Sequence, residues 1–94
     1  MTSDVDKTLH LKVDDVVWRK IGEELVVLEL STSTYLTLNI AAAHLWVVLA
    51  DGATVGELVD SLCNKYGISP EKSRNDVDAF LCALRERELV ILDA

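Results

Sequence analysis

Two histidines and two cysteines are the side chains of this 94-residue sequence best suited to metal binding or nucleophilic catalysis. His10 lies near the start of the chain and His44 in an alanine-rich segment, while Cys63 and Cys82 fall in helical patterns without a CxxC spacing. Structural metal sites usually draw their thiolate and imidazole ligands from closely spaced pairs, which are missing here. We therefore expect no metal and no cofactor, and both cysteines reduced and half-buried.

The acidic residues offer no better case for catalysis. There are 16 of them, spread along the whole chain, and their spacing selects no pair for general acid–base work. The glycines mark turns and do not form a phosphate-binding loop. A chain of this length also leaves little room for a deep cleft. The sequence therefore predicts that the protein is not an enzyme.

Charge and hydropathy narrow the class of partner. The net charge of −7 disfavours nucleic acid, whose sequence-independent affinity depends on basic side chains, and suits a basic partner better. The start, MTSDVDKTLHLKV, lacks the apolar core of a signal peptide. No apolar run approaches the ~20 residues that span a bilayer. We expect a cytoplasmic protein that binds neither nucleic acid nor membrane.

The hydrophobic pattern predicts the elements that would hold a site. Stretches rich in β-branched residues predict strands at 16–21, 25–30 and 35–39. Helices are predicted after the N-caps Asn39, Thr54 and Ser69. We expect one α+β, winged-helix-like domain over residues 1–94, a three-stranded antiparallel sheet followed by three helices. Residues 1–8 are expected to be disordered.

The length of the loop after the second strand decides which side chains enter the core. Pairing Leu28 with Leu36 gathers the apolar side chains of both strands on one face, opposite Glu29. This register predicts a three-residue loop, 31–33, with Ser33 in a left-handed conformation. The residues predicted to face the core are Val26, Leu28, Leu30, Leu36 and Leu38.

The third strand, YLTLN at 35–39, suggests a function. An edge strand is usually protected by Lys, Pro or a bulge, yet this stretch offers the uncharged Thr34 and Thr37. Such an edge can accept a strand from another chain through its backbone. From the residues alone, covering of this edge by a segment such as 9–13 is an equal alternative.

The last two predicted helices also suggest a helix-turn-helix, so a winged-helix DNA-binding protein is an alternative. The segment 70–88 mixes acidic and basic residues, and it leaves no positive face for phosphate contacts. DNA binding is therefore the weaker hypothesis.

Five stretches of the sequence form a further pattern: DVVWRKIG at 15–22, ELVVLELSTSTYLTLN at 24–39, AAAHLW at 41–46, DGATVGELVDSL at 51–62 and DVDAFLCALRERELV at 76–90. Together they resemble the PqqD family, small domains that recognise ribosomally made precursor peptides. This resemblance extends from Val16 to Val90. It departs from the family pattern at Ser33 and Glu88, where glycine is frequent, and at Ile40, where proline is frequent.

The resemblance implies a non-catalytic protein that binds a leader peptide as a fourth strand, along the third strand and beside the third helix. It is most like the stand-alone subunit of lasso-peptide pathways, which works with a separate cysteine-type leader peptidase and a macrolactam-forming cyclase. The alternative within the family is a pyrroloquinoline-quinone-type chaperone that presents its peptide to a radical enzyme.

The expected peptide-binding residues come from the third strand and from one flank of the third helix. We favour this flank because Leu81 gives it an apolar centre between two arginines; the other flank carries Asp76, Phe80, Ala83 and Arg87. The predicted residues are Ser33, Thr34, Tyr35, Leu36, Thr37, Leu38, Arg74, Val77, Asp78, Leu81 and Arg85.

Overall fold

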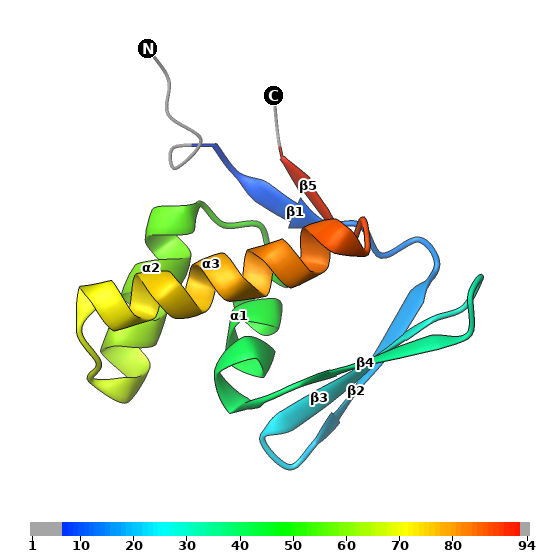
Figure 1. Cartoon of the computed structure of the whole chain (residues 1–94), viewed down its shortest axis with the longest axis horizontal. Helices are drawn as coiled ribbons and strands as arrows, with labels where there is room; N and C mark the ends of the chain where they lie inside the picture. The colour runs from blue at the N-terminus through cyan, green and yellow to red at the C-terminus, as the bar shows by residue number, and fades with distance from the viewer. Residues whose placement is uncertain (1–6, 93–94) are drawn as a thin grey trace.

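The structure is a computed structural model that describes residues 7–92 (Figure 1). In chain order its elements are β1 (Leu9–Leu11), β2 (Val16–Ile21), β3 (Glu24–Glu29), β4 (Thr34–Leu38), α1 (Ile40–Ala50), α2 (Val55–Tyr66), α3 (Pro70–Glu86) and β5 (Val90–Leu92). The predicted α+β order of three strands and three helices is confirmed, and β1 and β5 add a small second sheet. Of the predicted disordered segment 1–8, residues 1–6 lie outside the described residues.

The helices begin where the capping side chains predict. Asn39 Oδ1 accepts a hydrogen bond from the backbone at the start of α1, at 2.9 Å. Thr54 and Glu57 form a capping box at α2, and Ser69 caps α3 ahead of a proline at its first position. Gly67 ends α2 with a φ of 64°, a left-handed conformation that glycine adopts without strain. Local sequence therefore sets the helix boundaries.

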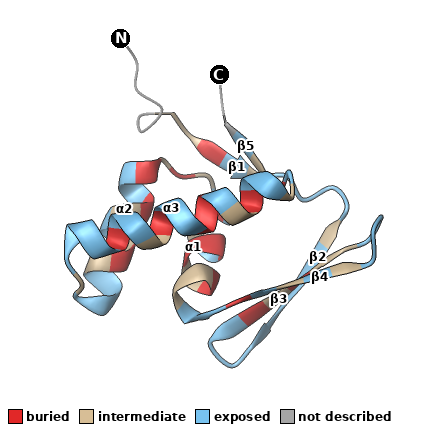
Figure 2. Ribbon diagram, viewed as in Figure 1, coloured by how far each residue is buried: buried red, intermediate tan, exposed pale blue. Residues whose placement is uncertain are grey.

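The core lies between the helices and one face of the β2–β3–β4 sheet (Figure 2). Trp46 of α1 is fully buried at its centre, and Trp18 of β2 meets it edge-on with ring centroids 5.5 Å apart. From α3, Val77, Phe80 and Leu84 pack into the same cluster, as their helical spacing predicts. The sheet therefore packs against α1, and α3 crosses over α1 (Figure 1).

β4 is an edge of its sheet. The strand order is β2-β3-β4, and β1 pairs with β5 in the other sheet. Leu9 also bonds across to Ala53, with N–H···O distances of 2.8 and 3.1 Å in the two directions. The segment 9–13 was the alternative cover for the third strand, but its strand residues are engaged elsewhere, so this alternative is wrong.

The predicted register of the β3–β4 hairpin is wrong by one residue. Val27 pairs with Leu36, and Leu28 pairs with Tyr35, so the loop is the four residues 30–33. Ser33 nevertheless has the predicted positive φ, 54°. A one-residue slip exchanges the two faces of a strand. The core face therefore holds Leu25, Val27, Leu36 and Leu38, and the predicted core residues Val26, Leu28 and Leu30 lie on the opposite face.

Glu29 explains why the predicted register is wrong. That register assumes that Glu29 faces solvent. In the structure Glu29 shares the core face with Val27, and its carboxylate pairs with Arg87 at the end of α3. The Arg87 Nη1–Glu29 Oε2 distance is 2.9 Å, and only 16% of the Glu29 side chain is exposed. A charged residue thus lies on the helix-facing side because a partner 58 positions away satisfies it.

Candidate functional site

The backbone of β4 presents unpaired groups at two residues. Leu30 N–H donates to Asp15 O at 2.9 Å, continuing the β2–β3 register, so even-numbered residues of β3 bond to β2 and odd-numbered ones to β4. The residues of β4 that bond to β3 are then Thr34, Leu36 and Leu38. The N–H and C=O groups of Tyr35 and Thr37 point away from the sheet, toward the open edge.

A groove runs beside this edge. It has a volume of about 620 Å³, and one wall is β4 with Leu36 and Leu38. The first half of α1 forms the floor, and α3 forms the other wall with Ala79, Phe80 and Ala83. Alanines on floor and wall leave space that longer side chains would fill. The groove is therefore an apolar trough next to unpaired backbone groups.

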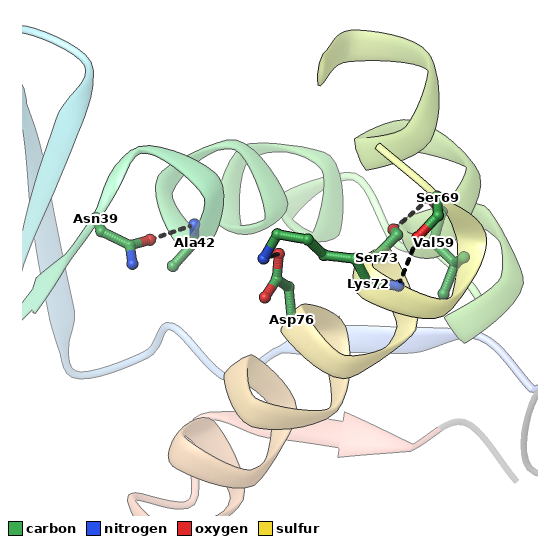
Figure 3. A network of polar contacts seen from close by, with 7 residues as sticks. All are labelled: Asn39, Ala42, Val59, Ser69, Lys72, Ser73 and Asp76. Carbon is green, nitrogen blue, oxygen red and sulfur yellow. Dashed lines mark hydrogen bonds and ion pairs between the residues drawn. The ribbon is translucent and has the colours of Figure 1, made fainter. Parts of the chain in front are cut away.

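One end of the groove is charged. Lys72 and Asp76 both line it, with Nζ and Oδ2 3.5 Å apart. Figure 3 shows this pair on the side of α3 that faces the first turn of α1, where the Asn39 side chain accepts a hydrogen bond from the Ala42 N–H. The Lys72 side chain is 64% exposed, so its ammonium remains accessible to a ligand in the groove.

The flank of α3 predicted from sequence does not border β4. Arg74, Asp78, Leu81 and Arg85 line a separate groove that includes Val55 of α2. Arg74 Nε pairs there with Asp78 Oδ1 at 3.3 Å. The alternative flank, with Asp76, Phe80 and Ala83, is the one that faces β4.

Burial separates the remaining predicted residues. Val77 is completely buried and Leu81 is 3% exposed, so both belong to the core. Sequence reasoning missed the contribution of Lys72, Ala79 and the floor of α1. The alanine run at 41–43 was the available signal, because consecutive small side chains at a helix start leave room for a neighbour.

A small polar cluster lies behind the groove. His44 Nε2 is 2.5 Å from Ser61 Oγ, and the imidazole meets the Tyr66 ring edge-on at 6.0 Å. Partial burial, followed by the ammonium groups of Lys65 and Lys20, lowers the pKa of His44 below its ordinary value of about 6.5. Because Tyr66 also lines the groove, His44 packs against the back of the groove wall.

The remaining candidates for chemistry are dispersed. Cys63 is partly buried and Cys82 is exposed, the latter against expectation, and both are free thiols. In the described part of the chain no three metal-ligating side chains gather. No helix there is long and apolar enough to cross a membrane.

The face of the β2–β3–β4 sheet turned away from α1, here called the outer face, is largely apolar. Val17, Ile21 and Tyr35 on it are 50%, 58% and 66% exposed. The register adds Val26 and Leu28 between them, with few charges. An antiparallel sheet that meets water on one side normally carries polar residues there. This composition is typical of a face that another surface covers.

Comparison with known proteins agrees with these features. Residues 24–90 match the sequence model of a family described as "Coenzyme PQQ synthesis protein D (PqqD)". No protein of curated function matches the chain.

Two solved structures have a similar fold. The chain described as "TbiB1 in Complex with the TbiA(beta) Leader Peptide" is 33% identical, with a TM-score of 0.78 over 90% of this chain and 98% of that one. The chain described as "Lasso peptide synthetase B1 complexed with the leader peptide" is 20% identical, with a TM-score of 0.76 over 88% and 96%. At 20% identity the second likeness concerns the fold alone.

Proposed function

The chain belongs to the PqqD family, and on this premise we propose that it binds the leader region of a ribosomally made precursor peptide as a fourth strand along β4. Members of this family are non-catalytic peptide-binding modules. The observation that carries the proposal is the uncharged β4 edge, where the backbone groups of Tyr35 and Thr37 are unpaired beside an apolar groove. The relative at 33% identity is described in complex with a leader peptide, which supports leader binding here.

The register of β4 determines how the side chains of such a peptide alternate. Residues opposite one another on neighbouring strands point to the same face. The peptide residues opposite Leu36 and Leu38 therefore enter the groove, and those opposite Tyr35 and Thr37 point to the outer face. This alternation holds for a parallel or an antiparallel peptide.

Simple energetics require apolar anchors. Two residues with both backbone groups available form about four hydrogen bonds, each contributing ~1 kcal/mol net. Ordering a disordered segment costs ~2–5 kcal/mol, which offsets most of that gain. Apolar side chains buried in the groove contribute ~1.5–3 kcal/mol each, so a micromolar Kd, which corresponds to ~8 kcal/mol, requires two anchors near the upper end of that range. We therefore propose a leader segment with large apolar residues two positions apart.

The proposed contact set keeps β4 and changes the flank of α3. It retains Thr34–Leu38, with Tyr35 and Thr37 acting through their backbones. On α3 it takes Lys72, Ala79 and Ala83, which line the groove, in place of Arg74, Asp78 and Arg85. Lys72 at the groove end favours a leader residue with a carboxylate.

The pathway is the finer part of the proposal. We propose that the bound leader is delivered to a separate cysteine-type leader peptidase and a macrolactam-forming cyclase, as in lasso-peptide biosynthesis, with the quinone-type chaperone as the alternative. The outer face supports a protein partner. Its apolar centre lies between Asp15 and Glu24, so it suits an apolar patch with a basic rim. DNA binding has less support, since the net charge is −7 and Arg74 on α3 is ion-paired with Asp78.

Titration of the labelled protein with a synthetic leader, taken from the precursor encoded beside the gene, tests the binding mode. We expect the largest amide shifts at Tyr35 and Thr37 and along the groove side of α3, with little change around Arg74 and Arg85. Shifts confined to the Arg74–Arg85 side would refute the β4 groove. A leader that gives no shifts anywhere would refute leader binding itself.

A further inference from the structure

The outer face consists of cross-strand rows that end at the open edge. One row runs Val17, Leu28, Tyr35 across β2, β3 and β4. The next runs Arg19, Val26, Thr37. Each row stops at a residue of β4 whose backbone groups point outward. The same two residues therefore mark both the attachment points for a new strand and the ends of the outer rows.

A fourth strand would lengthen these rows by one residue each. Resting on the proposed strand addition, we infer that the bound peptide completes the outer face, and that a partner protein docks on the resulting four-stranded surface. The peptide residue opposite Tyr35 adds to an apolar row, and the residue opposite Thr37 adds to a mixed row. The partner then contacts this domain and alternate residues of its peptide in one interface.

The structure favours a different protein over a second copy of this chain as the occupant. The chain carries a net charge of −7, and the register places Asp15 and Glu24 on the outer face, one near each end of β2. Two copies stacked through this face would bring these carboxylates together, which is unfavourable for like charges. A partner with an apolar patch and a basic rim matches both features.

This arrangement divides the peptide residues into two sets. Groove-facing residues set the affinity for this domain, because they fill the trough between β4 and α3. Outward-facing residues touch this domain only through exposed neighbours such as Tyr35, which is 66% exposed. They set recruitment of the partner instead. The domain therefore tolerates changes at alternate leader positions that the pathway does not.

The test uses the precursor leader and the leader peptidase of the same gene cluster. An alanine scan of the leader first identifies the groove-facing positions, whose truncation raises Kd for this domain. Aspartate at the position between two of them should change Kd by less than about fivefold, because exposed cross-strand pairs are weak. The same change should slow cleavage at least about tenfold at saturating domain, the size of loss seen when an interface residue is disrupted.

A double-mutant cycle distinguishes two explanations of slower cleavage by the aspartate variant. In one, the peptidase docks on the four-stranded surface formed by this domain and its peptide. In the other, the peptidase active site recognises the substituted leader residue directly. Val17→Lys on the outer face should slow cleavage without changing peptide affinity. Val47→Lys is the matched control, because Val47 is 49% exposed against 50% for Val17 but lies on α1. On a shared interface, the aspartate and Val17→Lys should together cost less than the sum of their separate effects.

Three results would overturn the inference. These are normal cleavage of the outward-facing variants at saturation, full additivity of the two changes, and concentration-dependent self-association through Val17. A leader that fails to bind the unmodified domain would instead refute the proposed function, so the two failures are distinguishable.

Discussion

The β2–β3–β4 sheet has two open edges, and they differ in how they are protected. On β2 the outward backbone groups belong to the even-numbered residues, including Trp18 and Lys20, by the same register that exposes Tyr35 and Thr37 on β4. β2 carries Arg19 and Lys20, charges that discourage another strand from pairing. β4, with the sequence TYLTL, carries no charge.

The surroundings differ in the same sense. The open side of β4 borders a groove of about 620 Å³ floored by alanines. Near Lys20 the space between sheet and helix is only about 100 Å³ and is shared with His44 and Lys65. A strand added to β2 would meet positive charge and little room for its side chains. The comparison teaches that an uncharged edge beside a groove can accept an added strand more readily than a charged edge with little space beside it.

The largest expected effect comes from proline at the two edges. Thr37→Pro removes an outward N–H without touching the β3–β4 ladder, and should raise leader Kd by about 30-fold or more, equivalent to ~2 kcal/mol. Lys20→Pro makes the same change on β2 and should leave Kd unchanged. Isothermal titration measures both, with Thr37→Ala as the control that keeps the N–H. Equal effects at both edges would remove the distinction between them.

Leu36→Pro sharpens the backbone assignment. The N–H of Leu36 bonds to β3, so its loss should destabilise the fold by ~1–3 kcal/mol, unlike Thr37→Pro. Urea unfolding of the two variants compares them. If Thr37→Pro is the more destabilising, the inward and outward residues of β4 have been assigned the wrong way round.

Filling the groove should have the next largest effect. Ala79 is exposed and lines the β4 groove, so Ala79→Leu should raise leader Kd about tenfold by occupying space that an apolar anchor needs, with little effect on stability. Cys82→Leu is the matched control, because Cys82 is also exposed but lines the groove on the other flank of α3. A stronger effect of Cys82→Leu in fluorescence anisotropy would restore the flank predicted from sequence.

The Glu29–Arg87 pair tests how β4 is held at its loop end, since Glu29 is the cross-strand neighbour of Thr34. Arg87→Ala leaves a sheltered carboxylate without its partner and should cost about 1–2 kcal/mol, lowering Tm by several degrees. The exposed Lys72–Asp76 pair provides the contrast, and Lys72→Ala should cost less than about 0.5 kcal/mol. Calorimetry that finds equal costs would mean that the Glu29 pair does not hold the edge.

His44 should give the smallest effect, and it lies between the two edges, near Lys20 of β2 and beside the Tyr66 wall of the groove. Because its pKa is lowered in the folded state, the unfolded chain binds more protons near the ordinary histidine value. This contribution to stability is complete above about pH 6.5 and is lost as pH falls through the folded pKa. His44→Gln should reduce the drop in urea midpoint between pH 7.5 and 5.5, and an unchanged drop would contradict the assignment.

Local sequence determined much of this protein. Capping residues such as Asn39 and Ser69 act through bonds to their own helices, so the helix starts are predictable. The bounds of β2 follow from a pattern that spans a few residues. The resemblance to the family rests on the same local features.

Only the tertiary structure decided which residues of β3 and β4 face the core and which flank of α3 borders β4. The sequence of β3, ELVVLE, is apolar on both sides, so neighbouring residues could not choose between two registers one residue apart. The choice depended on Glu29 meeting Arg87, 58 positions away. The flank of α3 that borders β4 likewise depended on how Val77, Phe80 and Leu84 seat the helix on the core. Packing sets the rotation of a helix about its axis, and packing involves residues far apart in the chain.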